Sequence, residues 1–326
     1  MYTVTGAPLQ GKQLHNLQAF LASCDLKYDT AIHYTVLLME DEQIIATGSL
    51  CGSTIRCVAV APDRQGEDLT GQLMTHLLQR AAQEGRRHLL LYTKPRNQLL
   101  FAPFGFYPVI RTPDCVLLEN RRAGLDTFLS ALPGKEGVIG CVVAHCNPFT
   151  RGHYHLIETA AQQCDWVHVF ILSEDNGLFS PDTRLAMAKE CLRPLPNVLV
   201  HASGPYMVSS ATFPAYFLKD SRQAAQVHCE TDLRLFGEKI APALHITKRF
   251  VGEEPLCPVT REYNRAMHAL LPTYGVEVIE IPRKTDGNAV ISASRVRALL
   301  ADCQQDAAAA LVPPAALPFI LPAKGE

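Results

Sequence analysis

The sequence predicts an α/β protein of two domains, an α+β domain over residues 1–130 and a domain with a parallel sheet over residues 131–326. Three observations lead to this expectation. The length of 326 residues suits two domains of ordinary size. The first third of the chain gathers short strand patterns around one amphipathic helix. From residue 138 onward strand and helix patterns alternate, which is typical of parallel strands covered by helices.

Several short elements support the first domain. Strand patterns cover 35–39, 43–49, 55–60 and 89–93, and leucines at helical spacing predict a helix over 69–84. An aromatic turn follows at 101–109, and the domain closes near Leu117. The charged stretch 119–137, with a short helix over 125–132, marks the boundary.

The second domain reads as strands and helices in turn. Strands are expected at 138–143, 166–172, 198–202, 249–251 and 276–281. Helices are expected at 153–164, 181–191, 213–225, 261–270 and 294–301. The Ala- and Pro-rich tail after Gln304 is expected to be loosely held. Ligands of such sheets bind beyond the carboxyl ends of the strands.

Composition excludes several classes of protein. Hydrophobic residues make up 48% and charged residues 19%, which is ordinary for a globular protein. The net charge of −2 gives no broad nucleic-acid footprint, so no nucleic acid partner is expected. The N-terminus lacks a signal-peptide pattern and no apolar run reaches about 18 residues, so we expect a cytoplasmic protein without a membrane partner. The 11 scattered cysteines predict reduced, mostly buried thiols and no metal site.

A loop between the strand at 138–143 and the next helix carries the first candidate site. A helix N-terminus attracts anions because its first N–H groups lack partners in the helix. Gly152 allows close approach of a ligand, and His153 can donate a hydrogen bond to a phosphate. The residues Thr150-Arg151-Gly152-His153 resemble the T/HxGH signature of the nucleotidyltransferase superfamily, which has a Rossmann-like fold. The residues of this loop expected to bind nucleotide are Asn147, Pro148, Phe149, Thr150, Gly152 and His153.

A second phosphate element stands near the C-terminus. Ile291, Ser292, Ser294 and Arg297 resemble the ISxSxxR motif with which the same superfamily holds the β- and γ-phosphates. Ser294 is a natural N-cap for the helix that follows, and Arg297 lies within its first turn. Hydroxyl groups, a helix N-terminus and an arginine fork make a good polyphosphate clamp. We expect His153, Thr150 and Arg297 to be catalytic.

Other polar residues are weaker candidates. Arg184 lies in a helix that resembles the superfamily's second helix and is expected to reach the nucleotide. A solvated helix face would explain Arg184 equally well. His145 lies in the loop, while Arg283 and Lys284 precede the ISxSxxR element.

Longer runs resemble one family. CNPFTRGHYHLIE, VGEEPLCPVTREYNRAM at 251–267, and EVIEIPRK followed by VISASRVR resemble the citrate lyase ligase family over nearly the whole chain. The resemblance implies that ATP, with Mg²⁺, and acetate give acetyl-AMP and diphosphate. The acetyl group would then pass to the thiol of the phosphoribosyl-dephospho-CoA group on the acyl carrier subunit of citrate lyase, releasing AMP. Two alternatives stay open: an adenylyltransferase of the phosphopantetheine or nicotinamide mononucleotide type, and a GNAT N-acetyltransferase.

The first domain resembles the GNAT acetyltransferase fold. The residues Val58 to Gly66 lead from a strand into a helix, as in that fold's CoA pyrophosphate loop, and Asn97 and Gly105–Tyr107 fit later landmarks. The loop departs from the usual pattern because Asp68 stands where a glycine or small residue is common. A carboxylate beside a pyrophosphate is repulsive, which argues against ordinary acetyl-CoA binding. The domain is expected to receive the CoA-like arm, to dock the carrier subunit, or to be structural.

Overall fold

The protein forms two compact units. The computed structural model describes residues 1–321 apart from 7, 176, 208–212, 219–220, 255–256 and 288. The first unit comprises Met1–Asp126 together with Phe213–Thr231, and the second comprises Thr127–Thr212 with Asp232–Glu326. The first unit therefore includes a segment from a part of the chain that the sequence pattern assigns to the second domain.

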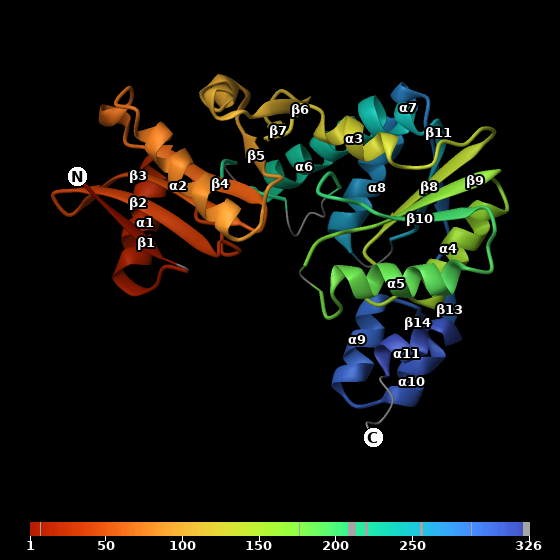
Figure 1. Ribbon diagram of the computed structural model, residues 1–326. Helices are drawn as coiled ribbons and strands as arrows, with labels where there is room; N and C mark the ends of the chain where they lie inside the picture. The colour runs from red at the N-terminus through yellow and green to blue at the C-terminus, as the bar shows by residue number, and fades with distance from the viewer. Residues whose placement is uncertain are drawn as a thin grey trace. The chain divides into compact units, whose positions relative to one another are not determined.

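A seven-stranded mixed sheet organises the first unit (Figure 1). Its order is β1-β2-β3-β4-β5-β7-β6, and every neighbouring pair is antiparallel except β4 with β5. This mixed sheet confirms the α+β architecture expected of the first domain. The strands are β1 (Tyr2–Gly6), β2 (Tyr34–Glu40), β3 (Gln43–Cys51), β4 (Thr54–Val60), β5 (Leu90–Thr93), β6 (Tyr107–Arg111) and β7 (Val116–Glu119).

Two helices accompany this sheet, α1 (Gly11–Ser23) and α2 (Leu69–Gln83). Leu73 and Leu77 of α2 are fully buried in one core with residues of β2, β3 and β4. The sequence pattern predicts neither the strand β1 nor the helix α1. All five residues of β1 are exposed or half-buried, and α1 begins without a capping side chain, so neither carries a strong local signal.

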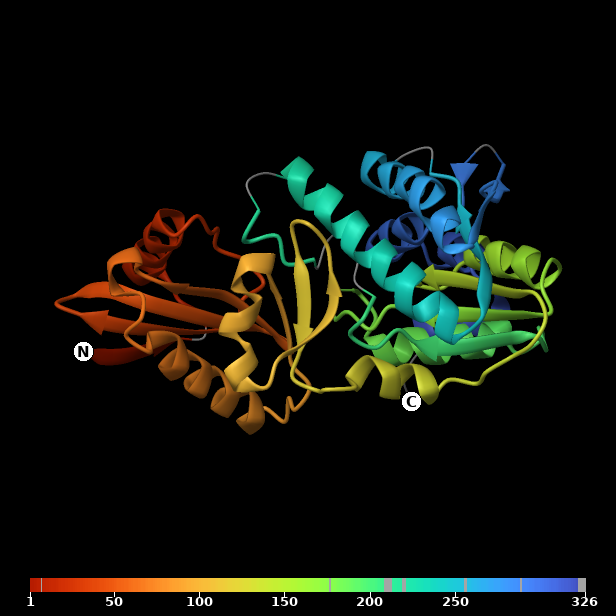
Figure 2. The same ribbon diagram turned by 90° about the horizontal axis from the view of Figure 1, so that it is seen from above.

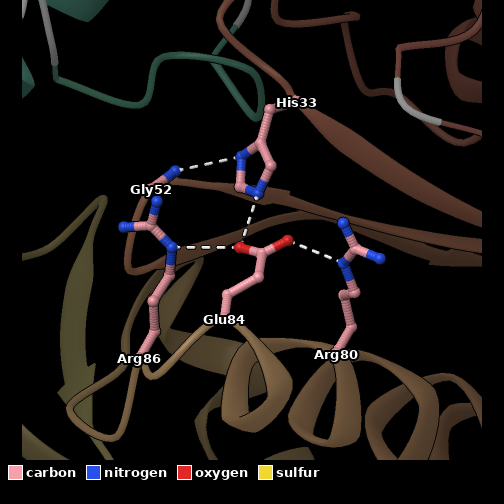
Figure 3. A network of polar contacts seen from close by, with 5 residues as sticks. All are labelled: His33, Gly52, Arg80, Glu84 and Arg86. Atoms are coloured by element: carbon pink, nitrogen blue, oxygen red, sulfur yellow. Dashed lines mark hydrogen bonds and ion pairs between the residues drawn. The ribbon is translucent and has the colours of Figure 1, made fainter.

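A carboxylate ties the end of α2 to the sheet (Figure 3). Glu84 accepts hydrogen bonds from Arg80 at 2.6 Å and Arg86 at 3.0 Å, and His33 lies 3.0 Å from it. His33 in turn accepts a hydrogen bond from the Gly52 amide at 3.3 Å. Burial alone would raise the pKa of Glu84, but the bonds from Arg80, Arg86 and His33 outweigh it and lower the pKa to about 2.

The second unit is built on a five-stranded sheet of order β10-β9-β8-β11-β12 (Figure 2). Every pair in it is parallel, which confirms the expected parallel sheet. Helices α4 and α5 pack on one face, while α7 packs against β11. The strands are β8 (Ile139–Ala144), β9 (Trp166–Ile171), β10 (Val198–Ala202), β11 (Ile246–Gly252) and β12 (Glu277–Ile281). The longer helices of this unit are α4 (Arg151–Ala161), α5 (Pro181–Leu192), α8 (Pro258–Leu270) and α9 (Ala293–Ala301). Two further helices, α3 (Gly124–Ser130) and α6 (Ser221–Leu235), begin in the first unit and end in the second.

Two expectations about the second half of the chain are wrong. The helix expected over 213–225 begins only at Ser221 as α6, and Phe213–Leu218 is non-helical and largely buried in the first unit. The tail is not loosely held up to Leu321, because α10 (Gln305–Ala310) and α11 (Leu317–Ile320) follow α9. Its apolar residues join the core beneath α4 and α5: Leu311, Val312, Ala316 and Ile320.

The cysteines agree with the expectation of reduced thiols. All eleven are free, and seven of them are buried.

Candidate functional site

The candidate site lies at the point in the parallel sheet where the order of successive strands reverses. From β8 the chain proceeds through β9 to β10 on one side, and later through β11 to β12 on the other. In such sheets the crevice for ligands lies at the carboxyl ends of the two strands at this switch point. The loop 145–150 follows β8, and Glu253 and Glu254 follow its neighbour β11. The loop after β8 and the segment after β11, both of which resemble the same family, therefore lie at the carboxyl ends of neighbouring strands.

Thr150 and His153 begin α4 as a capping box. Thr150 Oγ1 accepts a hydrogen bond from the His153 amide at 3.3 Å, and His153 Nδ1 accepts one from the Thr150 amide at 3.0 Å. Because Nδ1 accepts from a backbone amide, it carries no proton in the neutral ring, and the proton of neutral His153 lies on Nε2. The ring contacts of His153 with Thr150 both use Nδ1, so they do not occupy the Nε2–H.

The environment keeps His153 neutral. Burial, together with the positive charges of Arg283 and His145, lowers the pKa of His153 to about 4. A neutral imidazole donates through Nε2 without being a cation at physiological pH. Phe149, fully buried beside the loop, places its ring 5.5 Å from the imidazole.

The second phosphate element packs directly against the first. Arg297 Nη1 donates to the Asn147 carbonyl at 2.5 Å, and Nη2 donates to Ser294 Oγ at 3.1 Å. Asn147 and Arg297 are 150 residues apart in the chain. The sequence expectation that Ser294 caps the helix is wrong, because Ser292 is the N-cap of α9 and accepts from the Arg295 amide at 3.1 Å. Ser292 has the extended backbone of a cap, while Ser294 lies inside the first turn.

The start of α4 also touches the strand end before α9. A Cβ atom added to Gly152 would lie 3.1 Å from the Ile291 carbonyl oxygen, closer than most real contacts of this kind. A side chain at this position would therefore require the backbone of Ile291, which is buried, to shift by a few tenths of an ångström. Pro148 is buried in the same loop and is joined to Asn147 by a cis peptide bond. Asn147 Oδ1 accepts from the Phe179 amide at 3.0 Å, which holds the loop before α5.

Arg184 of α5 contacts the backbone of the neighbouring loops. It is fully buried, and its guanidinium group donates to backbone carbonyls of the loops after β8 and β9. The acceptors are the carbonyl oxygens of Phe179 at 3.1 Å, His145 and Leu172 at 2.8 Å each, and Glu174. Arg184 thus fixes the two loops that border the crevice.

Residues that follow β11 and β12 form a further polar cluster, which the sequence pattern does not predict. Arg283 donates to the Glu253 carbonyl at 2.6 Å and pairs with the Glu254 carboxylate. The Glu254 carboxylate also accepts from the Cys257 amide at 3.1 Å. Asn264 of α8 is buried and donates to the Gly252 carbonyl at 3.0 Å. Pro255 and Leu256 of the GEEP run lie outside the described residues. The sequence does contain a signal for this cluster. Two acidic residues, Glu253 and Glu254, follow β11, and the basic residue Arg283 follows the next strand, β12.

The described residues carry neither a cluster suited to a metal ion nor a helix suited to a membrane. Over the described ranges no group of three or more His, Cys, Asp and Glu side chains could hold a metal ion. Over the same ranges the helices are too short or too polar to span a membrane.

Comparison with known proteins places this site in a family. The model of the citrate lyase ligase C-terminal domain matches residues 139–320, which include both phosphate elements and the segment after β11. The [citrate [pro-3S]-lyase] ligase of Klebsiella pneumoniae is 40% identical over 94% of this chain and 92% of its own length. That of Haemophilus influenzae is 43% identical over 95% of both chains. The chain belongs to the citrate lyase ligase family.

More distant similarities match one half of the chain at a time. The phosphopantetheine adenylyltransferase of Streptococcus uberis is 22% identical over 46% of this chain, compared with the near-complete coverage by the citrate lyase ligase family. Among solved structures, Escherichia coli ElaA covers 37% of this chain at 17% identity, with a TM-score of 0.34. An acyl-CoA N-acyltransferase from Pseudomonas aeruginosa covers 37% at 18% identity, with a TM-score of 0.33.

Proposed function

We propose that this protein is an ATP-dependent ligase that activates acetate as acetyl-AMP. It then transfers the acetyl group to the thiol of the phosphoribosyl-dephospho-CoA group on the acyl carrier subunit of citrate lyase. Family membership supports ATP use and the ligase reaction. The structural observation that carries the proposal is the contact of Arg297 with Asn147, which joins two separate phosphate-binding elements into one site.

ATP would lie across the starts of α4 and α9. The first N–H groups of both helices would face its phosphates, and Ser292, Ser294 and Arg297 would hold the β- and γ-phosphates. The guanidinium group of Arg297 donates one hydrogen bond to Asn147 and one to Ser294, and these bonds fix its orientation. Its other N–H groups would then bind phosphate oxygens. Mg²⁺ would enter with ATP, bound through phosphate oxygens rather than by a cage of side chains.

The acetate carboxylate would attack the α-phosphorus. One acetate oxygen forms the new P–O bond, and the bond from the α-phosphorus to the bridging oxygen breaks, so that diphosphate leaves. Negative charge grows on the α-phosphate oxygens, and the His153 Nε2–H is oriented to donate to them. Thr150 orients His153 through the capping box and adds a hydroxyl to the site. The protein thus contributes mainly positioning and electrostatic stabilisation.

The second half-reaction would consume the mixed anhydride. The carrier thiol attacks the acetyl carbon, the bond to the AMP oxygen breaks, and the thiol proton passes to solvent. Water must be kept away from acetyl-AMP until this thiol arrives. The remaining candidate residues would act by positioning the helix starts and the loops around them: Asn147, Pro148, Phe149, Gly152, Ile291 and Arg184.

One assay tests the proposal against its alternative. Purified protein is incubated with ATP, Mg²⁺ and labelled acetate, and acetyl-AMP and diphosphate are measured. Acetate-dependent formation of both supports the ligase. Diphosphate released only with phosphopantetheine or nicotinamide mononucleotide would instead identify an adenylyltransferase. A His153→Asn protein serves as the control for contaminating activity.

A further inference from the structure

In the first unit, two parallel strands separate partway along their length. β4 and β5 pair only at Thr54 with Leu90 and at Ile55 with Leu91, although β4 continues to Val60 and β5 to Thr93. Beyond the paired residues Cys57 has a φ of 54°, in the left-handed region, and the pairing of β4 with β3 shifts there. Such a bulge bends a strand. The split leaves backbone N–H and C=O groups of both strands without ladder partners, so something else must satisfy them.

A tyrosine from the second half of the chain enters this split. Tyr216 is buried, and its hydroxyl group donates to the Tyr92 carbonyl oxygen of β5 at 2.6 Å. The Cys57 backbone of β4 is also within hydrogen-bonding reach of the phenol oxygen. One phenol therefore contacts the backbone of both strands where they separate. Burial raises the pKa of Tyr216 well above its usual value, so the hydroxyl group remains a donor.

The residues around Tyr216 hold it in place. The Tyr216 carbonyl oxygen accepts from the Lys27 amide at 2.7 Å, and the Cys57 thiol donates to the Lys27 carbonyl oxygen at 3.5 Å. Phe213 packs edge-on against the Tyr92 ring at 5.4 Å. Phe213, Tyr216, Phe217 and Leu218 are all buried.

A second, independent observation concerns the helix that follows β4. The start of α2 follows β4, and its N-cap residue Asp68 has a φ of 57°. A Cβ atom added to Gly71 would lie 2.4 Å from Asp68 Oδ1, so this carboxylate lies against the first turn of α2. The nearby cation Arg64 is already paired with Glu40 and Glu67. A carboxylate in this place occupies the helix start that would otherwise attract a phosphate.

We propose that Tyr216 and Asp68 are specificity-determining residues that close the first unit to acyl-CoA. A CoA-type ligand has amides that can pair with separated strands and a diphosphate that suits a helix start, and this chain fills both places with its own groups. The first unit then keeps a docking or structural task. The inference concerns the first unit alone and does not depend on the ligase reaction.

Binding of acetyl-CoA to the full chain tests this closure. Titration calorimetry is done with α,β-methylene ATP at saturation, so that adenine binding in the second unit does not contribute. The variants are Tyr216→Ala with Asp68→Gly, and Tyr216→Phe as the matched control that keeps the ring in the split. A position with φ of 57° accepts glycine without strain. Opening the site should raise the apparent affinity of the double variant at least about tenfold over the wild type, because the competent state becomes populated.

The binding results for the wild type and the variants decide whether the first unit is closed to acetyl-CoA. No measurable binding by the wild type and the Tyr216→Phe protein, with binding by the double variant, supports the closure. Binding by the wild type at micromolar acetyl-CoA would overturn it, whatever the variants do. A double variant that keeps the circular dichroism spectrum of the wild type but binds no better would also overturn it.

Discussion

The starts of α2 and α4 are two versions of the same local structure with opposite chemistry. Each helix follows a strand that has a parallel neighbour, so each start is a potential anion site. At α2 the Asp68 carboxylate lies against the first turn. At α4 the cap is the uncharged pair Thr150 and His153, with Arg283 close enough to affect the His153 pKa.

The difference shows that a strand–helix turn does not by itself make a phosphate site. What matters is which side chain the turn places at the helix start. A carboxylate satisfies the local dipole and repels phosphate, whereas a capping box uses backbone and ring nitrogen and leaves room for an anion. Each of the following changes tests one side of this comparison.

The largest expected effect is on the loops that hold the α4 start. Arg184→Met leaves four backbone carbonyls without their donor and should lower the free energy of unfolding by about 3–5 kcal/mol. Urea unfolding followed by the fluorescence of Trp166, the only tryptophan, measures the second unit. Arg193→Met, at an arginine that is 80% exposed beyond the same helix, is the matched control. A loss below 1 kcal/mol in Arg184→Met would contradict this role.

The next test separates capping from chemistry at His153. Asparagine can place an acceptor where Nδ1 lies, and glutamine can place an N–H near the position of Nε2. His153→Asn should keep the thermal stability and lose diphosphate release at least about 100-fold. His153→Gln should lose stability and retain more activity. If the asparagine variant turns over like the wild type, the Nε2–H has no part in the reaction.

Arg297 should affect ATP binding more than folding. Arg297→Ala removes the contacts with Asn147 and Ser294 and should raise the KM for ATP about 10–50-fold, with a smaller effect for Arg297→Lys. Arg295→Ala, two residues earlier in α9, is the control because its ion-pair partner is Asp286. Equal effects of the two alanine variants on KM would show that α9 needs positive charge rather than the Arg297 fork.

A smaller effect is expected at the far end of α2. Glu84→Gln should destabilise the first unit by about 1–2 kcal/mol at neutral pH, since Glu84 is held by Arg80, Arg86 and His33. The folded pKa of about 2 lies below the unfolded value, so this stability is present above about pH 4.3 and is lost as the pH falls towards 2. Hydrogen exchange of β2 and β3 measures it. Glu67→Gln, at a residue in a more exposed ion pair, should change exchange little.

The smallest effect is an expected absence of change. With a pKa of about 4, His153 stays neutral, and it should add no limb to the pH profile of diphosphate release between about pH 6 and 8. Its folded pKa lies below the unfolded value, so the unfolded chain binds more protons and stability falls as the pH drops from about 6.5 to 4. Titration of the ring protons by NMR measures the pKa directly. A value near 6.5 would contradict the buried, neutral state.

The sequence by itself determined the strands and helices with strong periodicity, the two phosphate elements and the family. Local patterns suffice for these because an apolar strand, a glycine before a histidine and a capping serine act within a few residues. It placed the cap of α9 two residues late, at Ser294 instead of Ser292, because both serines are suitable caps and only the backbone conformation distinguishes them.

Only the tertiary structure decided what these residues contact. It brought Arg297 to Asn147, turned Arg184 inward to four carbonyls, and packed the C-terminal tail into the core. It also sent Tyr216 into the split between β4 and β5 and left the Asp68 carboxylate against α2. These outcomes depend on burying apolar surface and on satisfying backbone groups that lie far apart in the chain, and no local pattern records either requirement.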